Sequence, residues 1–471
     1  MSTNYQRLSL STTFFVASIF ALILSIFLVE NEGSVSTLSL VILLVLLTCS
    51  LRRPNFLVIE SVTFTGFAII ASHLFYLMPL SHIGLRLDDP YALYDSQKYA
   101  LSAQMVVQGG DGLGHWMSFG IEQYLISIYR AFGVDESNVL AANALLLAVS
   151  LVLLFRSVIK STERNHLASG ILVLCAIPLT LFYAGQGSKE ALCIFTTSLF
   201  LFSIAPPSAG RRYAILGVLT IVLTLFIRPS LAVLYFIFWC GISVRNRSLL
   251  SRDLVYALPA AVLLVASAIF VSELTLGLDL DFWLDYGAVL LDTSSRLATS
   301  QAYNSNESGL AYQIKSALSP ENPILYVLFT PLKMLLVWVS PFPALTNPFA
   351  YPVSSVDLSS YVYSLIVTTS AVLNVCILPV ILYLAVNSKK LSDNERTILY
   401  FTIFYLAVIA FSYPTQFTRH RVLIELPIFL IVLRNTGFIS SSYSLFLKIA
   451  ITLAWSALFL MTVIINFWTL Q

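Results

Sequence analysis

Charged residues are scarce in this sequence. They make up only 11% of the 471 residues, whereas hydrophobic residues make up 58%. Soluble domains usually carry charge on about a quarter of their residues, so this composition does not supply a surface that faces water. The apolar residues come in runs of about 20, the length that a helix needs to cross a hydrocarbon core of roughly 30 Å. The sequence therefore excludes a soluble globular enzyme and predicts an all-α polytopic membrane protein.

An excess of positive charge and a set of paired cysteines are also missing. The net charge is only +2, and a nucleic-acid partner would require Lys and Arg clustered on a water-exposed face. The cysteines show neither the CxxC spacing of a metal site nor paired external positions. All five fall within expected spans: Cys49, Cys175, Cys193, Cys240 and Cys376. We therefore expect no nucleic-acid partner and no disulfide framework, and we expect no metal site of the zinc type.

The distribution of Lys and Arg predicts the orientation of the chain, because short cytoplasmic loops retain these residues. Basic groups follow the second, fourth, sixth and eighth apolar runs and precede a late one, at 52–53, 156–164, 211–212, 245–252 and 389–396. With a cytoplasmic N-terminus, every group lies on the cytoplasmic side. No small-residue cleavage site follows the first run, 12–29, so we expect it to be retained as a helix.

One apolar segment, from about Pro323 to Val339, does not fit this alternation. If it crossed the membrane fully, the last basic group would lie outside. Pro331, Pro341 and Pro343 favour a broken helix, so we interpret the segment as re-entrant or interfacial. The prediction is a single membrane domain over 1–471, with about thirteen spans and an external C-terminus.

Two long polar loops are then expected on the outer face, at about 81–138 and 273–322. Both are longer than a connection between helices requires, and long ordered loops usually carry function. Any chemistry is therefore expected on the external side of the membrane.

Carboxylates in the first loop are candidates for acid-base chemistry. Asp88 and Asp89 lie close to Arg86, directly after a membrane span. Adjacent carboxylates at a membrane exit could serve as a general base or hold a divalent cation. The alternative is a helix cap ahead of Pro90, although a cap needs one Asp rather than this pair and Asp95.

Basic residues at the ends of spans are candidates for binding an anion, because a charge in or beside the membrane is costly. Lys189 stands at the start of a helix, where free N–H groups and the helix dipole favour negative charge. Arg228, before Pro229, marks a tight external turn and offers a planar fork of donors to phosphate oxygens. The alternatives are interfacial anchoring of both side chains, or an ion pair of Arg228 with a loop carboxylate.

A third basic group, Arg419-His420-Arg421, lies at the external end of a late span. Two external Arg residues run against the positive-inside tendency, which indicates a bound anion. His420 could act as a base or a phosphate ligand, whereas a lone His is more often structural. Glu425 follows Arg421 by four residues, so an ion pair within the helix is expected. Arg296, in the second loop, is a weaker phosphate candidate, with a solvated helix face as the alternative.

The order of these motifs resembles the GT-C superfamily of polytopic glycosyltransferases, and within it the bacterial O-antigen and surface-polysaccharide polymerases. The resemblance is sparse over roughly 85–434. It is carried by Asp88-Asp89 with Tyr94-Asp95-Ser96, Ser188-Lys189-Glu190, Arg228-Pro229, Ser340-Pro341-Phe342-Pro343 and Arg419-His420-Arg421. The chain departs from the common transferase pattern by placing three spans, rather than one, before the acidic loop, which favours the polymerase interpretation.

The resemblance implies a multi-pass enzyme of the bacterial inner membrane, with a cytoplasmic N-terminus and a periplasmic active site. It would join undecaprenyl-diphosphate-linked oligosaccharide repeat units, with Asp88 or Asp89 as the base and His420 as a further catalytic candidate. The residues expected to bind the diphosphate are Arg86, Lys189, Arg228, Arg296, Arg419 and Arg421. The expected partners are this lipid-linked oligosaccharide, membrane lipids and, as an open question, a chain-length regulator.

Two other functions remain open. A GT-C transferase would add one sugar from a polyprenyl-phosphate donor, and a divalent cation could assist it. Otherwise no cofactor is expected. A flippase or transporter would move the lipid-linked glycan without breaking a bond. Transporters often show inverted repeats and broken helices near the midplane, whereas this sequence shows no repeat and its notable charges gather on one face.

Overall fold

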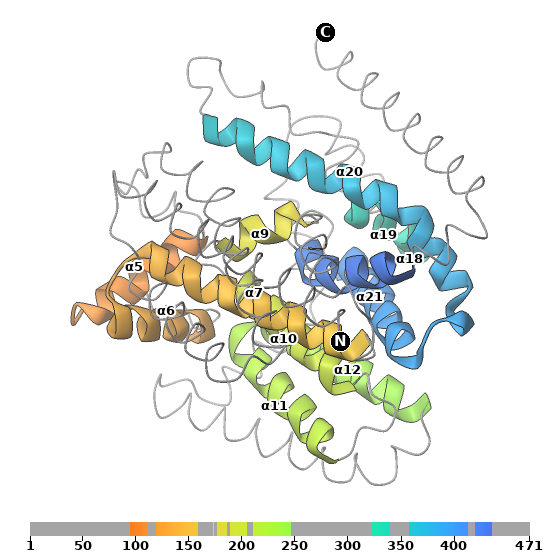
Figure 1. The fold of residues 1–471 in the computed structure, drawn as a ribbon, viewed down its shortest axis with the longest axis horizontal. Helices are drawn as coiled ribbons and strands as arrows, with labels where there is room; N and C mark the ends of the chain where they lie inside the picture. The colour runs from red at the N-terminus through yellow and green to blue at the C-terminus, as the bar shows by residue number, and fades with distance from the viewer. Residues whose placement is uncertain are drawn as a thin grey trace, which may run out of the picture. The chain divides into compact units, whose positions relative to one another are not determined.

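The computed structural model describes residues 95–110, 119–158, 173, 177–185, 189–204, 211–245, 323–339, 358–412 and 420–435. Within these ranges the regular structure is helical and no strand occurs (Figure 1). This confirms the all-α class for the described part of the chain. The count of about thirteen spans depends on segments outside it and stays a prediction.

Three described helices are long and apolar enough to cross a membrane: Asn138–Val158, Thr369–Val386 and Asp393–Phe411. Shorter apolar helices accompany them, at Glu190–Ile204, Arg212–Ile227, Pro229–Ile242 and Thr330–Val339. These helices agree with the composition, which predicts a membrane protein.

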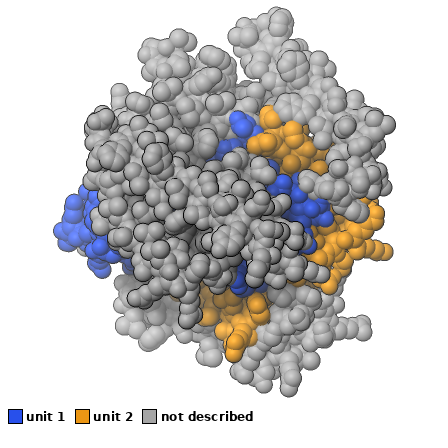
Figure 2. Space-filling view, viewed as in Figure 1, with its two compact units in different colours: residues 1–202, 348–370, 422–435 blue, residues 203–347, 371–421, 436–471 orange. Residues whose placement is uncertain are grey.

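The chain forms two compact units, each assembled from segments that are distant in sequence (Figure 2). Unit 1 comprises Met1–Phe202, Pro348–Ser370 and Val422–Asn435, and unit 2 comprises Ser203–Asn347, Ala371–Arg421 and Thr436–Gln471. The boundary falls within continuous helices, at Ser370 and again at Arg421. The expectation of one membrane domain stays a prediction.

The helices of unit 1 are α5 (Asp95–Val107), α6 (Phe119–Phe132), α7 (Glu136–Val158), α9 (Pro178–Gly185) and most of α10 (Glu190–Ile204). α5 packs against α6, α6 against α7, and α7 against α9. α6 is amphipathic: Ile121 and Leu125 are fully buried, while Gln123 is exposed. Gly133 ends α6 with a φ of 95°, which glycine adopts without strain. The first predicted outer loop therefore contains two packed helices, α5 and α6.

Polar contacts hold the α5–α6 pair together and join it to α7. The Ser102 hydroxyl of α5 donates to the Glu122 carboxylate of α6. The Tyr124 hydroxyl of α6 donates to Oδ1 of Asn143 in α7 over 2.8 Å. Burial raises the pKa of the Tyr124 phenol well above its ordinary value. Tyr124 therefore keeps its proton, and with it this hydrogen bond, to a higher pH than an exposed tyrosine would.

The helices of unit 2 are α11 (Arg211–Ile227), α12 (Pro229–Arg245), α18 (Pro323–Leu328), α19 (Thr330–Val339), the second half of α20 (Leu358–Val386) and α21 (Asp393–Ser412). α11 packs against α12, and α21 packs against both α12 and α19. The ring of Phe401 in α21 lies 5.9 Å from that of Tyr235 and 5.1 Å from that of Phe238, both in α12. Aromatic packing therefore contributes to the contact between α12 and α21.

The basic group predicted between two late spans lies on a short turn. The 3₁₀ turn Ser388–Lys390 follows α20, and both lysines in it are exposed. Ser392 and Glu395 then form a capping box at the start of α21, with the Ser392 hydroxyl 2.6 Å from Oε2 of Glu395. A basic turn therefore joins two candidate spans, as the sequence predicts.

The segment that breaks the charge alternation forms two helices. α18 ends at Leu328, and α19 begins at Thr330. Pro331 lies in the first turn of α19, where its missing N–H leaves no helical hydrogen bond unmade. The interruption is limited to Phe329, whose N–H still donates to the Leu325 carbonyl and whose carbonyl accepts from the N–H of Lys333, each over 2.9 Å. The re-entrant or interfacial position of the segment stays a prediction.

Candidate functional site

Arg228 lies on a one-residue turn in unit 2. α11 ends at Ile227 and α12 begins at Pro229. The Arg228 N–H donates to the Thr224 carbonyl over 2.7 Å, and the Arg228 carbonyl accepts from the N–H of Leu231 over 3.0 Å. Proline suits the first helical position, because it needs no N–H there. The tight turn that Arg228-Pro229 predicts is confirmed.

The side chain of Arg228 contacts His420, which is 192 residues away in sequence. Nη2 of Arg228 lies 2.7 Å from Nδ1 of His420. His420 is buried, and it lies at the beginning of the described helical residues 420–435. Both side chains belong to unit 2. The fold therefore brings together two residues that the sequence selects from separate motifs.

The chemistry of this contact assigns the histidine tautomer. A guanidinium group only donates hydrogen bonds, so Nδ1 of His420 must accept. We therefore assign the proton of the neutral ring to Nε2, an inference from the partner rather than an observation of hydrogen. Nε2 is then a hydrogen-bond donor, and Nδ1 is occupied by Arg228. This arrangement suits binding of an anion better than removal of a proton.

The backbone of His420 is held by α21. The Tyr405 hydroxyl donates to the His420 carbonyl over 3.1 Å. Tyr405 is itself buried, with its ring centroid 6.1 Å from that of Phe401. Because Tyr405 is buried and packs against Phe401, it restricts the position of His420 beside Arg228.

Arg421 is fully buried, and one of its contacts is structural. Its Nη1 donates to the Trp338 carbonyl over 2.9 Å. Trp338 lies in the last turn of α19, where carbonyl groups lack partners within the helix and the helix dipole favours a cation. The Trp338 indole in turn donates to the Asn374 carbonyl of α20 over 2.8 Å. Arg421 therefore caps α19, and its predicted role as a diphosphate ligand stays a prediction.

Lys189 lies at a helix start in unit 1, as the sequence predicts. Its carbonyl accepts from the N–H of Cys193 over 2.9 Å, which makes it the residue before the first turn of α10. Its ammonium group lies 5.3 Å from the ring centroid of Tyr99 in α5, within the range of a cation–π interaction. Glu190, the first residue of α10, is buried. Lys189 is thus positioned against α5.

Sequence reasoning missed the surroundings of Glu425 in unit 1. This carboxyl group is fully buried. It accepts hydrogen bonds from the Thr180 hydroxyl over 2.6 Å and from the Ser370 hydroxyl over 3.1 Å. These partners are 245 and 55 residues away in sequence. Serine and threonine are common in membrane helices, so no local pattern identifies them as partners. The ion pair of Glu425 with Arg421 stays a prediction.

The other predicted site residues lie outside the described ranges: Arg86, Asp88, Asp89, Arg296 and Arg419. Their roles stay predictions, as do those of the second outer loop. Among the described residues, no group of three His, Cys, Asp or Glu side chains is placed to hold a metal ion.

Comparison of the chain with protein-family models, curated proteins and solved structures found no match. The described residues define the protein as an all-helical chain with candidate membrane spans and a partly buried Arg–His contact. The resemblance to GT-C enzymes remains a prediction from the sequence, and the function is argued from the site.

Proposed function

We propose that the protein is a glycosyltransferase of the polysaccharide-polymerase type. It joins undecaprenyl-diphosphate-linked oligosaccharide repeat units at the periplasmic face of a bacterial inner membrane. The contact between Arg228 and His420 supports this proposal most strongly. Two candidate phosphate ligands from distant segments meet there, with the cation Arg421 next in sequence.

The Arg228–His420 pair has the donors that a diphosphate needs. A guanidinium carries five N–H donors in a planar fork, so it can hold His420 and a phosphate oxygen at once. The Nε2–H of His420 adds a donor whose direction is fixed by the same contact. Such preorganised donors act strongly in a partly buried site, where the dielectric is lower than in water.

The proposed reaction is a displacement at an anomeric carbon. A sugar hydroxyl of one lipid-linked repeat unit forms a bond to the anomeric carbon of another, and the carbon–oxygen bond to the lipid diphosphate breaks. The diphosphate leaves with the electron pair, and the hydroxyl proton passes to a base. Negative charge grows on the leaving diphosphate, so Arg228 and His420 stabilise the transition state more than the ground state.

The tautomer of His420 favours the carboxylates as the base in this proposal. Because Nε2 of His420 carries a proton and Nδ1 accepts from Arg228, we assign proton removal to Asp88 or Asp89. The further diphosphate ligands in the proposal are Arg86, Lys189, Arg296, Arg419 and Arg421. A cation cofactor has no role in this reaction.

Polysaccharide profiling of a deletion strain tests the proposal. The strain is complemented with the wild type, Arg228→Ala, His420→Ala or the control Arg212→Ala at matched expression. Arg212 is an exposed residue at the start of α11. We expect the deletion strain to retain single-repeat material and lose the polymer ladder. We expect Arg228→Ala and His420→Ala to behave like the deletion, and Arg212→Ala like the wild type.

Two outcomes contradict the polymerase assignment. Loss of the single-repeat band from the deletion strain would indicate an earlier step, either a single-sugar transferase or a flippase. An unchanged ladder in the deletion strain would exclude polymerisation altogether.

A further inference from the structure

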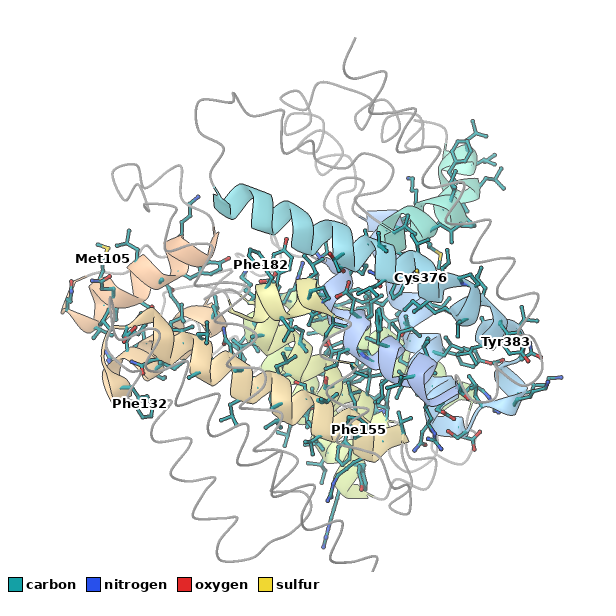
Figure 3. The ribbon with its side chains drawn as sticks, turned by 45° about the horizontal axis from the view of Figure 1, so that its top comes forward. Met105, Phe132, Phe155, Phe182, Cys376 and Tyr383 are labelled. Carbon is teal, nitrogen blue, oxygen red and sulfur yellow. The ribbon has the colours of Figure 1, made fainter. Side chains whose placement is uncertain are left out.

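An exposed apolar stripe runs along α18 and α19. Its members, 39 to 70% exposed, are Ile324, Leu325, Val327, Leu328, Leu332 and Leu335. Ile324, Leu328, Leu332 and Leu335 follow one another at three or four residues, and Leu325 and Val327 lie beside them in α18. This spacing places the six residues along one side of a nearly continuous helical segment. In Figure 3, side chains stand outward from the pale teal-green helical segment near the upper right, which the colours of Figure 1 identify as α18 and α19. We call this surface the α18–α19 stripe.

The opposite side of α19 is buried within unit 2. Lys333 and Val337 are almost completely buried there, and α19 packs against α21. Residues 323–339 would extend over about 25 Å at the rise of an α-helix. The segment therefore has one side fixed to the protein and one long apolar side that is open.

The stripe ends close to the cationic residues. Leu335 lies one helical turn before Trp338, and the Trp338 carbonyl accepts from Arg421. His420 is the residue before Arg421 and contacts Arg228. A long apolar surface thus leads toward Arg421, His420 and Arg228 within the same unit.

We propose that the α18–α19 stripe holds the polyprenyl chain of the lipid-linked substrate while Arg228 and His420 hold its diphosphate. This inference rests on the proposed function and specifies where the lipid lies. A hydrocarbon chain gains little by leaving bilayer lipid for an apolar helix. The ionic contacts of the diphosphate therefore provide the affinity, and the stripe that begins beside them determines the path of the chain.

Site-specific photo-crosslinking of the full-length protein in lipid nanodiscs tests this path. Benzoylphenylalanine replaces Leu328 or Leu332 in the stripe, or Leu382 of α20 as the control. Leu382 is 52% exposed, close to the 47% of Leu332, and lies near the basic turn. The probe is radiolabelled undecaprenyl diphosphate. Competitors are unlabelled undecaprenyl diphosphate and phosphatidylglycerol.

We expect the probe to label the two stripe positions and not Leu382. Undecaprenyl diphosphate should abolish this labelling, whereas phosphatidylglycerol, which has an anionic head without a polyprenyl chain, should not. Combining the stripe substitution with Arg228→Ala should reduce labelling roughly tenfold at fixed probe concentration, because a hydrogen bond to a charged group is lost.

The possible results separate this inference from the proposed function. Equal labelling at all three positions, without competition, would show that the stripe faces bulk lipid and would overturn the inference. Saturable binding of the probe with labelling at Leu382 of α20 instead of the stripe would also overturn it, while leaving the proposed function in place. A wild-type protein that shows no saturable binding of undecaprenyl diphosphate would contradict both.

Discussion

The contact between Arg228 and His420 gives the sharpest prediction, because it makes two distant residues act as one unit. If the proposed polymerisation is the activity, we expect Arg228→Ala and His420→Ala to lower its kcat/KM by about 10- to 100-fold each. A hydrogen bond to a charged group contributes about 1.5–3 kcal/mol, and about 1.4 kcal/mol corresponds to a tenfold change in rate. The 2.7 Å separation of the two nitrogen atoms places this contact at the short, strong end of the range.

The double variant tests whether the two residues are coupled. When two residues act as a unit, the double variant loses little more activity than either single variant. We therefore expect the kcat/KM of the double variant Arg228→Ala/His420→Ala to be close to that of the less active single variant. The assay is elongation of a synthetic undecaprenyl-diphosphate oligosaccharide by purified full-length protein. Arg212→Ala is the control for loss of a positive charge, and thermal unfolding verifies that each variant is folded.

Two conservative variants separate the roles of the histidine nitrogen atoms. Asparagine at 420 offers an acceptor near the position of Nδ1 but no donor at Nε2, and glutamine offers a donor near Nε2. If the Nε2–H binds the diphosphate, His420→Gln should retain more activity than His420→Asn. Wild-type activity of His420→Asn would instead assign His420 to positioning Arg228. Multiplicative losses in the double variant would refute the coupling itself.

The remaining predictions concern stability, measured by thermal unfolding in detergent. Glu425→Ala should lower the free energy of unfolding by about 2–5 kcal/mol, because it leaves two buried hydroxyl groups without their acceptor and opens a cavity. Glu425→Gln keeps an acceptor and should lower the free energy of unfolding less. Equal losses in the two variants would contradict this reason. Leu125→Ala should lower the free energy of unfolding by about 2–5 kcal/mol, because Leu125 is fully buried in α6. Gln123→Ala, on the exposed side of the same helix, should change it by no more than about 0.5 kcal/mol. Ser392→Ala should lower the free energy of unfolding by about 0.5–2 kcal/mol, because α21 loses its N-terminal cap. An unchanged unfolding temperature would show that the capping box contributes nothing to stability.

The sequence predicts features that depend on neighbouring residues in the chain. Arg228-Pro229 predicts the turn between α11 and α12, and Lys189-Glu190 predicts the start of α10. Pro331 predicts an interruption of the helix, which is limited to Phe329 between α18 and α19. These predictions succeed because proline lacks an N–H and charged residues are costly in a membrane, and both effects act locally.

The same reasoning does not predict which helices are neighbours. α11, α12 and α21 are apolar on most faces, so their sequences carry no clear periodicity that separates a buried face from one exposed to lipid. α6 is different, because its polar and apolar residues alternate at helical spacing. Its buried face, with Ile121 and Leu125, is therefore readable from the sequence even though it lies in the predicted outer loop.

By itself, the sequence predicts a helical membrane protein, because so few charges do not supply a surface that faces water and the apolar runs have the length of a membrane-spanning helix. It also identified the charged residues that lie in or beside an expected span, where a charge is energetically costly and therefore suggests a function. Only the tertiary structure decided that Arg228 meets His420 and that Glu425 accepts from Thr180 and Ser370. Contacts between residues 55 to 245 positions apart depend on how whole helices pack, and that packing is set by the shapes of many side chains together.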